Sequence, residues 1–135
     1  AEALEGAEGF RVEALAPTPS PILQADPKQL RKAIVYLVEY LAHKAPPQTP
    51  LQTVTVEMRR VRGAPGEAII VIAAPADIRP DDVSTLFDLI ALVPRGLKQV
   101  GPAVSYRVIV AMGGRLDYQY RPDNFAFLIT LPTVM

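Results

Sequence analysis

The run EAIIVIAAP at residues 67–75 constrains the fold of this chain more than any other feature of its 135 residues. Apolar side chains stand at consecutive positions from Ala68 to Ala74, without the alternation that marks a strand with one wet face. Because successive side chains of a strand point to opposite faces of a sheet, both faces of this strand are apolar. Such a run is typical of a central strand, so the sequence predicts a sheet built around it.

A long helix is predicted before this strand, in the stretch from Asp26 to Ala45. Asp26 is placed to cap the helix, and Pro27 to take its first position, where a backbone N–H is not needed. Pro46 follows Ala45 and cannot continue a helix. Apolar residues recur at helical spacing and predict one narrow buried stripe, formed by Leu30, Ile34, Leu37 and Leu41.

Two further helices are predicted after the central strand. One begins at Pro80, and the other is expected to start with Pro102, directly after Gly101, and to stop at Gly113 and Gly114. Their spacing predicts buried side chains at Val83, Leu86, Phe87 and Ile90 in the first helix, and at Val104, Val108, Ala111 and Met112 in the second.

Four more stretches have the character of strands, namely residues 10–15, 51–61, 115–120 and 124–132. The resulting order is strand, helix, two strands, two helices and two strands. We therefore predict an α+β fold: a two-layer α/β sandwich with a mixed, largely antiparallel sheet and three helices on one face. Residues 10–135 are expected to form this single domain, and residues 1–9 to be disordered or a trimmed end of a longer protein.

Composition argues against several classes of function. The 14 basic and 14 acidic residues give a net charge of zero, which does not suit a nucleic-acid or membrane surface. The basic cluster Arg59, Arg60 and Arg62 is interpreted as a solvated strand end. With no cysteine and the single histidine His43, the chain is not expected to hold a metal. No apolar run approaches the roughly 20 residues that span a bilayer, and we expect a cytoplasmic domain without membrane contact.

Four stretches of the chain carry a family resemblance: ADPKQLRKAIVYLVEYLAHKA (25–45), AAPADIRPDDVSTLFD (73–88), GLKQVGPAVSYRVIVAMGGRLDYQY (96–120) and FAFLITLP (125–132). In this order they resemble the catalytic ATP-binding domain of sensor histidine kinases, of the HATPase or GHKL type, whose wider group includes gyrase B and MutL. The first is similar to the opening helix of that family, and the second to its D-x-G-x-G-I loop with the helix after it. The third resembles its G-x-G-L-G-L helix, and the fourth its final strand. The resemblance implies the sandwich predicted above and a nucleotide site.

The resemblance places the metal ligand of the family on the first helix. The asparagine that ligates Mg²⁺ between the phosphates corresponds to Tyr40, and its partner position one turn earlier to Tyr36. Both lie on the flank of the apolar stripe where the ligand of the family sits. A phenol does not replace this ligand, because Mg²⁺ prefers carboxylate, amide carbonyl or water oxygens. Glu39 does not substitute for it, since it points almost opposite the stripe.

The loop that reads adenine in the family also differs. Its aspartate, which accepts a hydrogen bond from the adenine amino group, corresponds to Ala73. Two glycines of the same loop correspond to Pro75 and Asp77. Alanine offers no acceptor, and proline is far stiffer than glycine. Asp77 is expected to support the loop or to cap the helix that begins near Pro80.

The phosphate-binding segment keeps only part of the family pattern. Gly96 and Gly101 stand at two of the glycine positions, whereas Gln99 stands between them and Pro102 follows the last. In the family, glycine-rich backbone amides at a helix N-terminus cradle the phosphates beneath a mobile lid. Only the eight residues DLIALVPR at 88–95 are available here, which leaves no room for a lid of that kind.

These differences lead to the hypothesis of a degenerate kinase domain, a pseudokinase, within a two-component signal-transduction protein. It would have no catalytic residue, no metal and no cofactor, and it would bind a protein partner, self-associate or regulate. The alternative is a divergent sensor histidine kinase that still binds ATP and Mg²⁺ through rearranged contacts. A third possibility is a pocket that has moved to another small ligand, with Tyr36 and Tyr40 as its aromatic wall.

A candidate interface follows from the two-layer architecture, in which the helices cover one face of the sheet only. The other face would expose either Ile69 and Val71 or Ile70 and Ile72 of the central strand, together with Leu128. An exposed apolar sheet face tends to mark an interface. The sequence therefore predicts a protein-interaction surface there, unless the N-terminal connector covers it.

Overall fold

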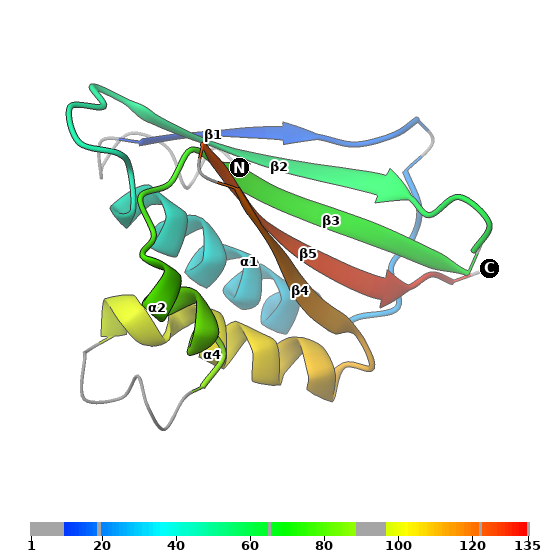
Figure 1. Ribbon diagram of the computed structural model, residues 1–135. Coiled ribbons are helices and arrows are strands. Elements are labelled where there is room, and N and C mark those ends of the chain that lie inside the picture. The colour runs from blue at the N-terminus through cyan, green and yellow to red at the C-terminus, as the bar shows by residue number, and fades with distance from the viewer. Residues whose placement is uncertain (1–9, 19, 65, 89–96, 122, 135) are drawn as a thin grey trace.

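The computed structural model describes residues 10–134 apart from residues 19, 65, 89–96 and 122, and for residues 97–99 it describes the backbone only. Its elements are β1 (Phe10–Leu15), α1 (Pro27–His43), β2 (Gln52–Arg60), β3 (Glu67–Ala74), α2 (Pro80–Ser84), α4 (Leu97–Ala111), β4 (Arg115–Arg121) and β5 (Asn124–Pro132). These three helices lie on one face of the sheet (Figure 1). The predicted two-layer α+β sandwich is confirmed.

The five-stranded sheet has the order β1-β2-β3-β5-β4. β1 runs parallel to β2, and the other three neighbouring pairs are antiparallel. β3 is the middle strand, and its residues alternate between half-buried and buried, with Ile70 and Ile72 in the core. The sheet is therefore mixed and largely antiparallel, and the apolar run 67–75 forms its centre as predicted.

Helix α1 begins where its capping residues predict. The carboxylate oxygen Oδ1 of Asp26 accepts hydrogen bonds from the backbone N–H groups of Lys28 at 2.9 Å and Gln29 at 3.3 Å. Pro27 occupies the first turn, and the helix ends at His43, two residues before the expected Ala45. The predicted stripe is buried most deeply at Leu37 and Leu41, which are wholly inaccessible to solvent, as is the neighbouring Val38.

The two later helices differ from the sequence prediction. Helix α2 is only five residues long, and of its predicted core positions Leu86, just beyond its end, is buried, while Ile90 lies outside the described residues. Helix α4 does not start at Pro102: it already includes Leu97, so the proline lies inside the helix. The predicted inner face is confirmed in part, because Val108 and Met112 pack half-buried against the main core and Val104 packs against a smaller cluster. Ala111 is exposed, and the buried positions are Val100, Gly101, Pro102, Ala103, Ser105 and Ile109.

The structure decides between the two alternatives for the uncovered sheet face. Ile70 and Ile72 point into the core, with exposed fractions of 3% and 0%, so neither can contribute to an interface. Ile69 and Val71 lie on the opposite face, where Val71 is registered with Leu128 of β5. All three are half-buried. The predicted interaction surface is thus reduced to Ile69, Val71 and Leu128, and it stays a prediction.

The connector between β1 and α1 runs past the end of β5 (Figure 1). Leu23 forms an isolated bridge with Thr133, and the Gln24 N–H donates to the carbonyl oxygen of Pro132 at 2.8 Å. These contacts hold the connector against the C-terminal end of β5. Among the helices described, none is both long enough and apolar enough to cross a bilayer.

Candidate functional site

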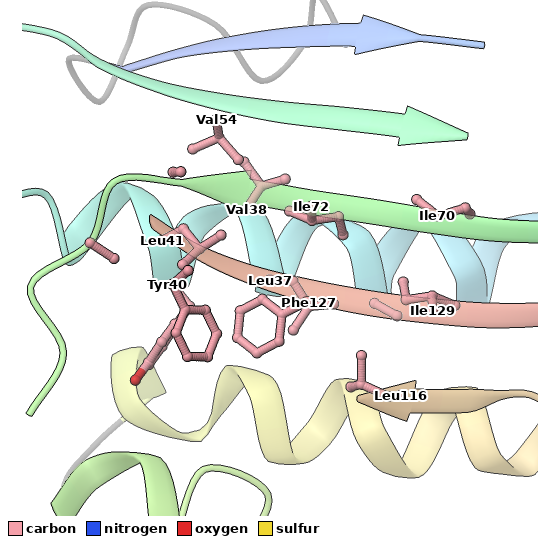
Figure 2. Close-up of a cluster of buried hydrophobic side chains, with 14 of the residues drawn as sticks. Leu37, Val38, Tyr40, Leu41, Val54, Ile70, Ile72, Leu116, Phe127 and Ile129 are labelled. Carbon is pink, nitrogen blue, oxygen red and sulfur yellow. The ribbon is translucent and has the colours of Figure 1, made fainter. Parts of the chain in front are cut away.

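Tyr40, which the resemblance places at the position of a metal ligand, has its side chain in the hydrophobic core. Its exposed fraction is 3%, and its ring meets that of Phe127 edge to face, with 5.9 Å between centroids. Figure 2 shows the two aromatic side chains facing each other between α1 and β5. The ammonium group of Lys44 lies 5.5 Å from the centroid of the Tyr40 ring. The phenol therefore fills the space between helix and sheet.

The surroundings of Tyr40 keep its hydroxyl group protonated. Burial, and to a lesser extent the negative charge of Asp82, raise the pKa of Tyr40 to about 12. A neutral phenol is a weak ligand for a hard divalent ion, which prefers anionic or carbonyl oxygens. The electrostatics at this position thus favour a core residue over a metal ligand.

Tyr36 lies one turn earlier and has a different environment. Its side chain is 37% exposed, whereas its backbone forms a close contact with helix α4. A methyl group placed on Gly101 would lie 3.2 Å from the carbonyl oxygen of Tyr36 and 3.5 Å from its Cβ. Gly101 therefore allows α1 and α4 to approach closely. Tyr36 and Tyr40 therefore do not line one common open pocket.

A second polar contact fixes the same helix pair. The hydroxyl group of Ser105, which is fully buried in α4, donates to the carbonyl oxygen of Ala33 in α1 at 2.8 Å. The sequence analysis did not identify Ser105 as a residue that fixes the packing of α4 against α1. The available signal was a lone serine among the apolar residues of the helix, where a buried hydroxyl needs a partner.

The loop after β3, which the resemblance aligns with the adenine-reading loop of the family, is anchored to the end of α1. The N–H of Asp77 donates to the carbonyl oxygen of Lys44 at 2.7 Å. Asp77 does not cap α2: the cap position is Arg79, and no side chain caps the helix. The contact that anchors the loop is thus made by the backbone of Asp77, and the loop-supporting role expected of its side chain stays a prediction.

The remaining predicted positions of this loop are distributed over different surroundings. Ala73 alternates with the core residues Ile72 and Ala74, so its methyl group lies on the uncovered face of the sheet. Pro75 is exposed. Gly96 and the side chain of Gln99 lie outside the described residues. The structure thus does not gather Ala73 with the tyrosines of α1.

Gln52, a further residue that the sequence analysis missed, joins three segments. It stands at the start of β2 and is 4% exposed. Its side-chain amide donates to the carbonyl oxygens of Leu41 at 3.2 Å and Pro75 at 2.6 Å. At the far end of the same loop, the hydroxyl group of Tyr120 donates to the carbonyl oxygen of Ile78 at 3.1 Å. The loop is therefore held at both ends by side chains.

Cavities of ligand size lie elsewhere in the described part of the molecule. One of about 350 Å³ opens between β1 and α1 and is lined mainly by apolar residues, among them Val12, Leu30 and Ile34. Another of about 410 Å³ lies between α4 and β4, beside Tyr106 and Tyr118. Neither Tyr36 nor Tyr40 lines these two. Across the described residues, no group of three or more histidine, aspartate or glutamate side chains is placed to hold a metal ion.

Comparison with known proteins identifies the fold. No protein-family model and no curated protein sequence matches the chain. Among solved structures, the mycobacterial sensor histidine kinase MprB is similar at 25% identity and a TM-score of 0.67, over 93% of this chain and 83% of that chain. The catalytic domain of histidine kinase ThkA is similar at 11% identity and a TM-score of 0.74, over 93% of this chain and 81% of that chain.

A larger kinase shows the same likeness in part of its length. Full-length ShkA, solved in complex with AMPPNP, is similar at 18% identity and a TM-score of 0.74. The match covers 95% of this chain but 26% of ShkA. The chain therefore has the fold of the catalytic ATPase domain of histidine kinases.

Proposed function

We propose that this histidine-kinase-like domain does not bind ATP productively and acts instead as a protein-interaction or regulatory module in a two-component signalling protein. In this view it keeps the architecture of the catalytic domain without its chemistry. It needs neither Mg²⁺ nor a nucleotide, and its output depends on contacts with other protein surfaces in the cytoplasm.

The burial of Tyr40 carries this proposal. The resemblance puts the Mg²⁺ ligand of the family at this position, and here the side chain packs edge to face on Phe127 with 3% of its surface exposed. A rotation that freed the hydroxyl group for a ligand would remove the ring from the core. Losing the burial of an aromatic side chain costs several kcal/mol, roughly 3–5 by the scale of phenylalanine-to-alanine changes.

The packing of Gly101 supports the same conclusion. In the family this glycine belongs to a segment whose backbone amides face the phosphates. Here it lies within α4, is buried, and rests on the backbone of Tyr36. As the fifth residue of α4, Gly101 has its backbone in the interior of the helix and not at the N-terminus, where free N–H groups could face a phosphate. The absence of side-chain acceptors at Ala73 and Pro75 adds a third, independent difference.

Equilibrium titration with ATP and ADP, with and without Mg²⁺, tests the proposal. We expect millimolar affinity or none by isothermal titration calorimetry, and no effect of Mg²⁺, because base, metal and phosphate contacts are all altered. ShkA, whose structure contains AMPPNP, serves as the positive control under the same conditions. Micromolar binding that depends on Mg²⁺ would instead establish the alternative, a divergent kinase that has rearranged its contacts.

A further inference from the structure

Strand β4 forms one margin of the sheet and has no strand neighbour on its outer side among the described residues. It is seven residues long, and all of its side chains except Leu116 are exposed. Figure 1 shows β4 at the margin of the sheet, above α4. An edge of this length presents backbone N–H and C=O groups that can pair with another strand.

Aromatic side chains gather below this edge, on the helix side. Tyr118 and Tyr120 of β4 are 37% and 41% exposed, and Tyr106 of α4 is 38% exposed. Phe87 stacks on Tyr106 with 5.0 Å between centroids and meets Tyr118 edge to face at 5.9 Å. Val110, one turn after Tyr106, is 49% exposed. Monomeric proteins rarely expose several large apolar side chains together, so this cluster points to a partner.

We propose that the partner is a second copy of this chain, bound through antiparallel pairing of the two β4 strands with Gln119 opposite Gln119 of the second copy. In this register Asp117 lies opposite Arg121 of the other copy. Two-fold symmetry repeats this pair, so two pairs of opposite charge line one face of the joint.

The other face of the joint carries the aromatic residues. Tyr118 of one copy lies opposite Tyr120 of the other, twice, on the side of the sheet that faces the helices. Cross-strand aromatic pairs stabilise antiparallel strands. Tyr106 and Val110 lie beside the same edge in each copy, so pairing of the strands brings apolar surface of both helix layers together.

Charge selects this register over its neighbours. Moving the two-fold axis to Tyr118 places Arg115 opposite Arg121 and leaves Asp117 opposite Gln119. Moving it to Tyr120 places Gln119 opposite Arg121 and leaves Asp117 beyond the end of the partner strand. Like charges directly opposite each other destabilise a strand pair, and of these three registers only the one centred on Gln119 pairs Asp117 with Arg121. Arg115 is already engaged within its own copy, 3.8 Å from Glu67. The inference does not depend on whether the domain binds nucleotide.

Disulfide trapping tests the register directly, because the chain contains no cysteine. In the Gln119→Cys variant the two thiols face each other across the axis, and Cβ atoms of directly opposite residues are about 5 Å apart. In the control, Asp117→Cys, the two thiols are four residues out of register, roughly 13 Å apart along the strand. Under a mild oxidant we expect the first variant to form covalent dimers at least tenfold faster than the second.

Charge reversal tests the same dimer without cross-linking. Sedimentation equilibrium should show a weak, reversible dimer of the unmodified chain, since one pair of short strands gives a small interface. Asp117→Arg should raise its dissociation constant roughly tenfold, and the double change Asp117→Arg with Arg121→Asp should restore it.

Three outcomes would overturn the proposal: a chain that stays monomeric at millimolar concentration, equal rates of cross-linking for the two cysteine variants, or a dissociation constant that the charge changes leave unaltered. Circular dichroism verifies that each variant is folded. If charge reversal unfolds the domain, the cysteine pair decides alone, because Gln119 and Asp117 are both exposed.

Discussion

At the scale of single residues, Tyr40 shows how one side chain can belong both to the core and to a position that a resemblance assigns to a ligand. Its ring is buried on Phe127, and its hydroxyl group has a pKa raised to about 12. A buried phenol that resists ionisation stabilises the fold only while it keeps its proton. The position therefore has a measurable signature in the pH dependence of stability.

We expect the free energy of unfolding to fall as the pH rises from about 10 to about 12, because the unfolded chain loses the Tyr40 proton first. Below pH 10 both states hold this proton and the contribution is complete. A separation of about two pKa units corresponds to roughly 3 kcal/mol. Urea denaturation at a series of alkaline pH values measures it, and Tyr40→Phe should show a shallower decline than the unmodified chain.

Tyr118→Phe is the matched control for this measurement, since the side chain of Tyr118 is 37% exposed whereas that of Tyr40 is buried. Its decline with pH should follow that of the unmodified chain more closely than Tyr40→Phe does. Equal slopes for the chain and its Tyr40→Phe variant would contradict a buried, protonated Tyr40.

Gln52 is the second residue whose contribution can be isolated. Its amide donates to two carbonyl oxygens, those of Leu41 and Pro75, and the Leu41 oxygen also accepts from the N–H of Lys44. Gln52→Leu keeps the approximate volume but leaves both carbonyl groups without this donor, so we expect a loss of about 1–3 kcal/mol in thermal or chemical unfolding. Gln29→Leu, at an exposed position of α1, should change stability by less than about 0.5 kcal/mol. A similar effect of the two changes on stability would contradict a structural role for the Gln52 side chain.

At the scale of elements, the contact between α1 and α4 combines a glycine with a buried serine. Gly101 lets the helices approach, and Ser105 bonds to the carbonyl oxygen of Ala33. Gly101→Val would place a branched side chain against the backbone of Tyr36. We expect a destabilisation of roughly 1–3 kcal/mol from overpacking, although valine is the better helix former.

Gly66→Val provides the control for that substitution, because a Cβ at Gly66 has no heavy atom within 4 Å. Denaturant unfolding of the two variants should separate them by at least 1 kcal/mol, a margin that overpacking usually exceeds. If Gly101→Val were as stable as Gly66→Val, close approach of the helices would not be the reason for this glycine.

The sequence predicted elements best where local chemistry decides them. Asp26 and Pro27 fix the start of α1, and the unbroken apolar run fixes β3 as the middle strand. The start of α4 was predicted wrongly, because proline is favoured in the first turn, whereas Pro102 lies inside the helix. Apolar residues occur on several sides of α4, so periodicity alone could not identify Ile109 and Ser105 as its buried residues.

The candidate site was predictable only in part, because its decisive contacts join distant segments. That Tyr40 stands beside the apolar stripe follows from helical spacing, but its burial depends on Phe127, 87 positions later. Gln52 and Ser105 act through hydrogen bonds to backbone carbonyl groups of other elements. No local sequence pattern predicts such partners. Positions assigned by resemblance could be named from the sequence, whereas what fills the space around them could not.

At the scale of the whole molecule, identities of 11–25% with kinase domains of the same fold show that architecture survives wide changes in side chains. The fold depends on burial pattern and strand order, which many residues satisfy. Ligand binding depends on a few atoms at fixed places. Stabilisation by a ligand is a property of the whole domain, and it therefore distinguishes a retained fold from a retained function.

Added nucleotide should leave the thermal stability of the domain almost unchanged. A ligand that binds only the folded state stabilises it by RT ln(1 + [L]/Kd), which is about 0.4 kcal/mol when the ligand concentration equals Kd and about 2.7 kcal/mol at a hundredfold excess. For a domain of this size these values correspond to shifts in Tm of roughly 2 °C and 10 °C. With millimolar ATP and Mg²⁺ we therefore expect a shift of at most about 2 °C by differential scanning calorimetry. A rise near 10 °C that disappears when Mg²⁺ is chelated would mean that the nucleotide site still functions, whatever residues now form it.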